Sequence, residues 1–135
     1  MSEIFVDTIK NKTGSTSLDS DKLPDMYSGS AKAWVNLNGT GTIASRDSLN
    51  VSSLTDIGTG KYDVTFTSSM DNANYSFVTN ASTTSGGTSS VVSLAGSGAG
   101  GTTLTTKYRI YTLTGGGSTF TDISFINSNV HGDLT

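Results

Sequence analysis

The chain has 135 residues, of which 33% are hydrophobic and 14% are charged, and its formal net charge is −3. It contains no cysteine, which excludes disulfide bonds and cysteine metal sites. The eight lysines and arginines are dispersed along the sequence, so we expect no basic face of the kind that neutralises the phosphates of a nucleic acid.

The low hydrophobic content bears on how the chain is stabilised. Soluble domains average about 45–50% apolar residues, glycine included, and a monomer of this size buries only about two-thirds of its unfolded surface. Burial between subunits would offset part of the lost chain entropy, so we expect a homo-oligomer. Disorder is the alternative explanation of the low hydrophobic content. Disordered chains, however, combine low hydrophobicity with a high content of charged residues, and only 14% of the residues here are charged.

Residues 1–30 are predicted to form an N-terminal arm. Ile4, Val6 and Ile9 give a short alternating run, and a glycine turn and a polar stretch follow. An isolated short strand needs partners, so the arm either attaches to a neighbouring subunit or particle, or is an edge strand with a surface loop. The first residues lack the pattern of a signal peptide, and no apolar run approaches the ~20 residues of a membrane span.

Three aspartates of the arm, Asp19, Asp21 and Asp25, raise the question of a calcium loop. An EF-hand loop needs acidic residues at alternate positions and a glutamate at its twelfth position. The spacing fails after Asp21 and no glutamate follows. A solvated loop is therefore predicted here, without a metal.

Residues 31–135 are predicted to form an antiparallel β-sandwich or jelly-roll-like domain. Tyr62, Val64 and Phe66 alternate with polar residues, as a half-buried strand requires. Strands are expected at 32–37, 41–44, 49–55, 61–67, 75–79, 103–113 and 120–130. Residues 46–48 are predicted to be a polar corner with a local Arg46–Asp47 ion pair. No segment shows the period and caps of a helix, so none is predicted.

No catalytic, cofactor or metal site is predicted. Gly96, Gly98 and Gly101 spell a G-x-G-x-x-G, but strand-prone threonines follow instead of the helix that a dinucleotide site requires. His131 and Asp133 lack the serine elbow of a hydrolase. Glycosidases need two facing carboxylates, whereas the candidate aspartates are expected at corners or solvent faces; they are Asp47, Asp56, Asp63, Asp71 and Asp122.

The stretch 31–77 carries a resemblance to a known family. The runs AKAWVNLNGTGTIASRDSLNVSS and GTGKYDVTFTSSMDNANYSF resemble a module of tail-fibre and other surface proteins of tailed bacteriophages, particularly phages of cyanobacteria and other aquatic bacteria. Members more often carry an aromatic where this chain has Leu37 and Leu49, and both changes keep an apolar side chain. The family motif names no catalytic residue.

The resemblance implies a non-enzymatic structural protein on the virion surface. The missing signal-peptide pattern indicates that such a protein is made in the host cytoplasm. The resemblance also implies a homotrimer that contacts other proteins of the tail or capsid, and it allows contact with a glycan or protein of the host surface. Contacts would be presented by the loops at 68–74, 81–90, 95–102 and 114–119.

Two alternatives remain open. A capsid decoration (cement) protein needs only a compact domain and an arm, and the length of the chain favours it. A carbohydrate-binding β-sandwich would display a row of exposed aromatic side chains, for which Trp34, Tyr62 and Tyr111 are the candidates.

Overall fold

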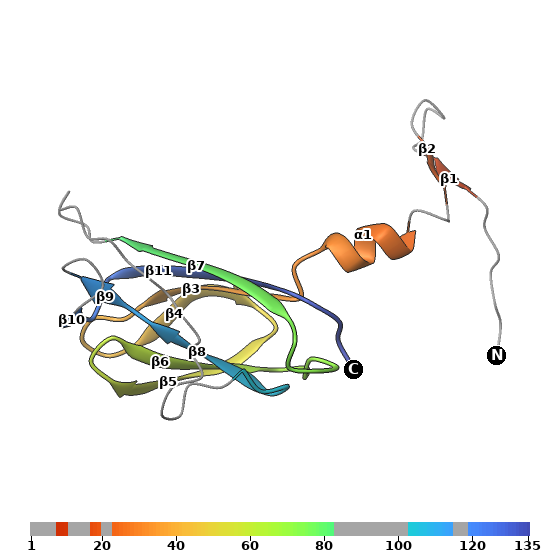
Figure 1. Cartoon of the computed structure of the whole chain (residues 1–135). Coiled ribbons are helices and arrows are strands. Elements are labelled where there is room, and N and C mark those ends of the chain that lie inside the picture. The colour runs from red at the N-terminus through yellow and green to blue at the C-terminus, as the bar shows by residue number, and fades with distance from the viewer. Residues whose placement is uncertain (1–7, 11–16, 20–22, 83–102, 115–118) are drawn as a thin grey trace. The chain divides into compact units, whose positions relative to one another are not determined.

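The computed structural model describes residues 8–10, 17–19, 23–82, 103–114 and 119–135 (Figure 1). The chain divides into two compact units, Met1–Ser30 and Ala31–Thr135. The first unit holds two short strands and a helix, and the second holds the other strands. Several residues discussed from the sequence lie outside the described residues: Ile4, Val6, Asp21, Gly96, Gly98 and Gly101.

In the first unit, strand β1 (Thr8–Lys10) pairs antiparallel with strand β2 (Ser17–Asp19). Helix α1 (Leu23–Gly29) follows, so the prediction that the chain contains no helix is wrong. Pro24 suits the first helical turn, because its φ is fixed in the helical range and the N–H that it lacks would have no partner there. Seven residues are too few to display a helical period in the sequence. None of the described helical residues forms a helix long and apolar enough to cross a membrane.

The second unit is an antiparallel β-sandwich, which confirms the predicted fold class. One sheet has the strand order β4-β3-β11-β7, and the other has the order β5-β6-β8. Figure 1 shows these two sheets as two layers. The strands of the first sheet are β3 (Ala33–Asn38), β4 (Ala44–Leu49), β7 (Ser76–Ser82) and β11 (Phe125–His131). Those of the second are β5 (Val51–Gly58), β6 (Lys61–Phe66) and β8 (Lys107–Tyr111). A small ladder joins β9 (Leu113–Thr114) and β10 (Thr119–Phe120).

The core lies between the two sheets and follows the alternation of the strands. Its buried apolar residues are Ala33, Val35, Leu37, Tyr62, Val64, Phe66, Met70, Tyr75, Tyr108, Ile110, Ile123, Ile126 and Val130. Met70 is fully buried among them. Three aromatic contacts, Phe66 with Tyr75 and Tyr108, and Tyr108 with Phe77, have ring centroids 5.5–5.6 Å apart. Such edge-to-face and tilted contacts add stability beyond that of the buried area.

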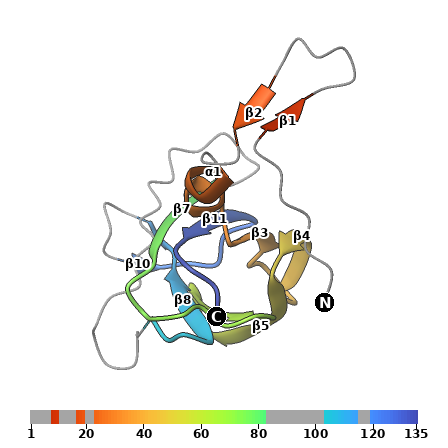
Figure 2. The same cartoon turned by 90° about the vertical axis from the view of Figure 1, so that its right-hand side faces the viewer.

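The chain crosses from one sheet to the other at Asn50, between the end of β4 and the start of β5 (Figure 2). Asn50 has a φ of 54°, in the left-handed region that asparagine tolerates better than most residues. Its side chain donates to the carbonyls of Lys32 and Ser68, both at 3.1 Å, and accepts from the Ser68 amide at 2.7 Å. One side chain therefore fixes the corner of the sandwich.

Some predicted strands differ from the observed ones. The expected strand at 41–44 and corner at 46–48 are wrong, because residues 44–49 form β4, with a bulge where the register to β3 shifts between Asn36 and Leu37. The expected strand at 49–55 is interrupted by the corner at Asn50. The expected strand at 103–113 is shorter, because Leu104 and Lys107 already form a tight turn. At Asn50, and between Leu104 and Lys107, a local turn overrides the β-propensity of the segment.

Candidate functional site

The candidate carboxylates do not all lie where the sequence suggested. Asp47, Asp56 and Asp71 are exposed, but Asp63 is only 4% exposed, so its predicted place on a solvent face is wrong. Arg109 binds both carboxylate oxygens of Asp63, through Nε at 2.5 Å and Nη2 at 3.1 Å, and Lys107 Nζ lies 2.8 Å from Oδ2. These bonds occupy the carboxylate and make it a structural cross-link between β6 and β8.

The electrostatics of Asp63 agree with that role. The hydrogen bond from Arg109 is the main influence that lowers the pKa of Asp63, and the bond from Lys107 adds to it against the opposing effect of burial. The group therefore stays ionised in the fold. A carboxylate with a lowered pKa and two bound cations is a poor general base near neutral pH.

Asp122 is half-buried and is also held by structural bonds. Its Oδ1 accepts the Gly60 amide at 2.7 Å and the Tyr62 hydroxyl at 2.8 Å. The Tyr62 hydroxyl also lies 3.1 Å from the Gly39 carbonyl. Burial, followed by the hydrogen bond to Asp122, raises the pKa of Tyr62 well above its ordinary value. Tyr62 is fully buried and therefore cannot belong to an exposed aromatic row.

Tyr108 contrasts with Tyr62, because its buried hydroxyl has no hydrogen-bond partner among the described residues. Burial raises the pKa of Tyr108 to about 12, and the influence of the Ser128 hydroxyl opposes this only in part. The Ser128 hydroxyl itself bonds with that of Thr79 at 3.2 Å. Tyr108 therefore acts as a large apolar core residue.

His131 and Asp133 are exposed near the end of β11. Across the described ranges, no three histidine or acidic side chains gather closely enough to hold a metal ion. Asp19 lies in β2 and Asp25 in α1, so these two aspartates belong to different elements. The predicted ion pair between Arg46 and Asp47 is wrong, because no ion pair of the described residues joins them and Arg46 turns to other partners.

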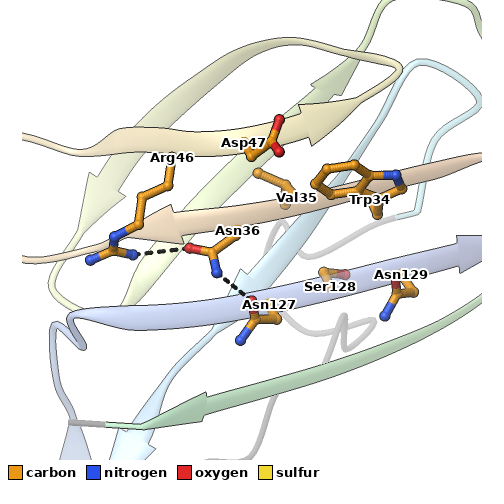
Figure 3. Close-up of a pocket in the computed structure, with 8 residues that line it drawn as sticks. All are labelled: Trp34, Val35, Asn36, Arg46, Asp47, Asn127, Ser128 and Asn129. Carbon is orange, nitrogen blue, oxygen red and sulfur yellow. Dashed lines mark hydrogen bonds between the residues drawn. The ribbon is translucent and has the colours of Figure 1, made fainter. Parts of the chain in front are cut away.

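The outer face of the four-stranded sheet carries a row of hydrogen-bonded side chains. Arg46 Nη1 donates to Asn36 Oδ1 at 3.1 Å, and Asn36 Nδ2 donates to Asn127 Oδ1 at 2.7 Å (Figure 3). Asn127 Nδ2 then donates to Asn80 Oδ1 at 3.0 Å. We call Asn36, Asn127 and Asn80 the amide row. With Arg46 at its end, the row crosses all four strands, β4, β3, β11 and β7.

Arg46 is held firmly at the end of this row. Its guanidinium also donates to the carbonyls of Leu37 at 2.8 Å and Ser124 at 2.6 Å. It lies over the Phe125 ring, with Cζ 4.2 Å from the ring centroid, in cation–π geometry. The bulge in β4 that places Arg46 here is one of the devices by which sheets redirect a side chain.

A shallow hollow of about 480 Å³ lies over the amide row. The side chains at its rim that matter here are Trp34, Asn36, Arg46, Asp47, Asn127 and Asn129. Trp34 is partly exposed and lies opposite Asn129 on the neighbouring strand. Tyr111 belongs to β8 in the other sheet, so Trp34, Tyr62 and Tyr111 do not form the aromatic row considered from the sequence.

The sequence indicates which side chains share one face of each strand, although it does not show which strands are neighbours in the sheet. Alternation in β3 places Trp34 and Asn36 on one face, and alternation in β11 does the same for Asn127 and Asn129. The pairing of β3 with β11, which are about 90 positions apart, is not encoded in either segment alone. Most residues of the predicted contact loops lie outside the described residues. The loop at 68–74 is described, and its part at 71–74 is an exposed turn.

Comparison with known protein families, with curated proteins and with solved structures finds no match to this chain.

Proposed function

We propose that this protein is a non-enzymatic structural component of the surface of a tailed-bacteriophage virion, similar to tail-fibre modules. The observation that carries the proposal is the amide row, a hydrogen-bonded polar feature that crosses four strands on an open sheet face. Asp63 and Asp122, the least exposed of the candidate carboxylates, are occupied by structural bonds. The resemblance of residues 31–77 to tail-fibre modules supports the virion location.

In this proposal the first unit attaches the protein, and the sandwich is displayed. Helix α1 exposes 58% of Met26 and 54% of Tyr27, and large apolar side chains exposed on so short an element favour burial against another chain. The other chain is a second copy in a homotrimer or a neighbouring virion protein. Replacing Met26 and Tyr27 with serine in the full chain should weaken assembly while the sandwich keeps its fold.

A capsid decoration protein is the second candidate, because an attachment unit followed by a compact sandwich would suit that role as well. Quantitative mass spectrometry of purified virions, with the major capsid protein as the reference, separates the two. A few to a few dozen copies per particle would support the tail, and hundreds of copies would support decoration. Absence from purified particles would overturn the virion proposal itself.

A further inference from the structure

We propose that the outer face of the four-stranded sheet binds a neutral oligosaccharide, through the amide row and Trp34. The inference rests on the proposed function, since it names the class of partner that the displayed domain would contact. The hollow of about 480 Å³ over the row falls within the range of small-molecule sites.

The hydrogen-bonding capacity left over in the amide row suits sugar hydroxyls. Each asparagine amide has two N–H donors and one oxygen with two lone pairs. Within the row, Asn36 and Asn127 each use one donor and one lone pair, which leaves each of them one donor and one acceptor. A hydroxyl both donates and accepts. Neighbouring hydroxyls of a pyranose can therefore bond to the remaining donor and acceptor of the same amide.

Arg46 fixes which way every amide points. A guanidinium can only donate, so the oxygen of Asn36 must face Arg46 and the nitrogen must face Asn127. The same constraint passes from Asn127 to Asn80. Because the amides are held before any ligand arrives, binding does not have to order them, which is the condition that favours affinity.

Trp34 supplies the apolar part of the site. It lies two residues before Asn36 on β3 and therefore on the same face, next to the row and partly exposed. An indole offers a flat apolar surface with low conformational entropy. The C–H face of a sugar ring could pack on it while the ring hydroxyls reach the amides.

The charges at the hollow favour a neutral ligand. Arg46 and Asp47 are the two charged residues of its lining, and they balance each other. Three of the five N–H donors of Arg46 already bind two carbonyls and the Asn36 amide, so few of them remain for an incoming anion. An acidic polysaccharide would therefore gain little here.

The test uses the full chain, whose single tryptophan is Trp34, so tryptophan emission, excited at a wavelength that tyrosine does not absorb, reports on this face. The probes are neutral hexasaccharides of glucose, mannose and galactose at millimolar concentrations. We expect at least one of them to change the Trp34 emission in a saturable way. Asn127→Ala removes the middle of the row, and the loss of one neutral hydrogen bond should weaken binding about fivefold or more.

Asn74→Ala, in the exposed turn before β7, is the matched control and should bind as the wild type does. If Asn127→Ala does not fold, as judged by near-ultraviolet circular dichroism, Asn80→Ala on the edge strand β7 takes its place. No response to any of the sugars would overturn the inference, and so would equal affinities in the wild type and the row variants.

A third outcome concerns contact between copies of the chain. If the wild type does not respond to the sugars and the row variants shift the sedimentation coefficient toward a smaller oligomer, the face is a subunit interface and the inference is overturned. Copy number in virions is measured independently. A protein present in virions that binds none of the sugars would overturn this inference alone, whereas absence from virions would overturn the proposed function.

Discussion

Asp63 and Arg109 lie directly opposite each other on β6 and β8, and their side chains meet at 2.5 Å although both belong to the face of the sheet that points away from the core. Arg109 exposes 16% of its side chain and Lys107 exposes 40%, so the two cations cover the carboxylate. The outer face of the three-stranded sheet therefore has a buried charged centre.

Replacing Asp63 with alanine should destabilise the protein by about 2–3 kcal/mol, because it leaves Arg109 largely buried without its partner. Arg109→Met should cost more than Lys107→Met, since Lys107 is the more exposed of the two cations. Urea unfolding followed by circular dichroism measures these differences. Asp71→Ala, at an exposed turn, is the control and should change stability little. Equal stabilities for the Asp63 and Asp71 variants would contradict the structural role.

The lowered pKa of Asp63 predicts how stability depends on acid. Because the folded pKa lies below the ordinary value of 3.8, the unfolded chain takes up the proton at a higher pH than the folded protein. The contribution to stability is complete above that ordinary value and is lost as the pH falls through the folded pKa. The wild type should therefore lose stability more steeply than Asp63→Asn between about pH 5 and pH 2. If the curves of unfolding free energy against pH were parallel for the wild type and Asp63→Asn, Asp63 would not contribute to the acid dependence of stability.

Two buried tyrosines should respond in opposite ways to loss of the hydroxyl. Tyr108→Phe removes a buried hydroxyl without a partner in the described structure, so stability should stay the same or rise by up to about 1 kcal/mol. Tyr62→Phe removes the bond to Asp122 and the contact with the Gly39 carbonyl, and should cost about 1–2 kcal/mol. Thermal unfolding of the two variants provides the comparison. A larger loss for Tyr108→Phe than for Tyr62→Phe would show that the hydroxyl of Tyr108 has a partner.

Two substitutions of Asn50 distinguish the cost of backbone strain at this corner from the cost of lost hydrogen bonds. Asn50→Gly keeps the left-handed backbone accessible but removes three side-chain bonds, and should cost about 1–2 kcal/mol. Asn50→Ala loses the same bonds and adds the penalty of a positive φ, which is about 1 kcal/mol more. Denaturant unfolding of the two variants would resolve the difference. If both variants were equally stable, the backbone at this corner would be free to relax.

The sequence predicts the period-two strands well, because alternation in a segment such as residues 61–66 is a local property. Tyr62, Val64 and Phe66 are buried as that pattern requires. The same pattern misplaces Asp63, since a polar residue on the outward face is expected in solvent unless the neighbouring strand is known. Arg109 lies 46 positions away, and nothing near Asp63 in sequence indicates their pairing.

The amide row could not be predicted from the sequence, because it also depends on which strands are neighbours. Each asparagine is placed on the correct face by its own strand, but the row depends on the lateral order of strands β4, β3, β11 and β7. Helix α1 was missed because its signals, a proline near its start and a glycine at its end, enclose too few residues to show periodicity.

The neighbouring positions of β3 and β11 determine how the sandwich would bear mechanical load. Ala33, at the start of β3, lies opposite Val130, near the end of β11, and the Lys32 amide bonds to the Val130 carbonyl at 2.8 Å. A force that pulls these two ends apart would open the ladder like a zip, one hydrogen bond after another. A force applied between Ala33 and the far end of β11, at Phe125, would instead load all the bonds between the strands together. The direction of pulling would therefore decide whether the sandwich yields at low or high force.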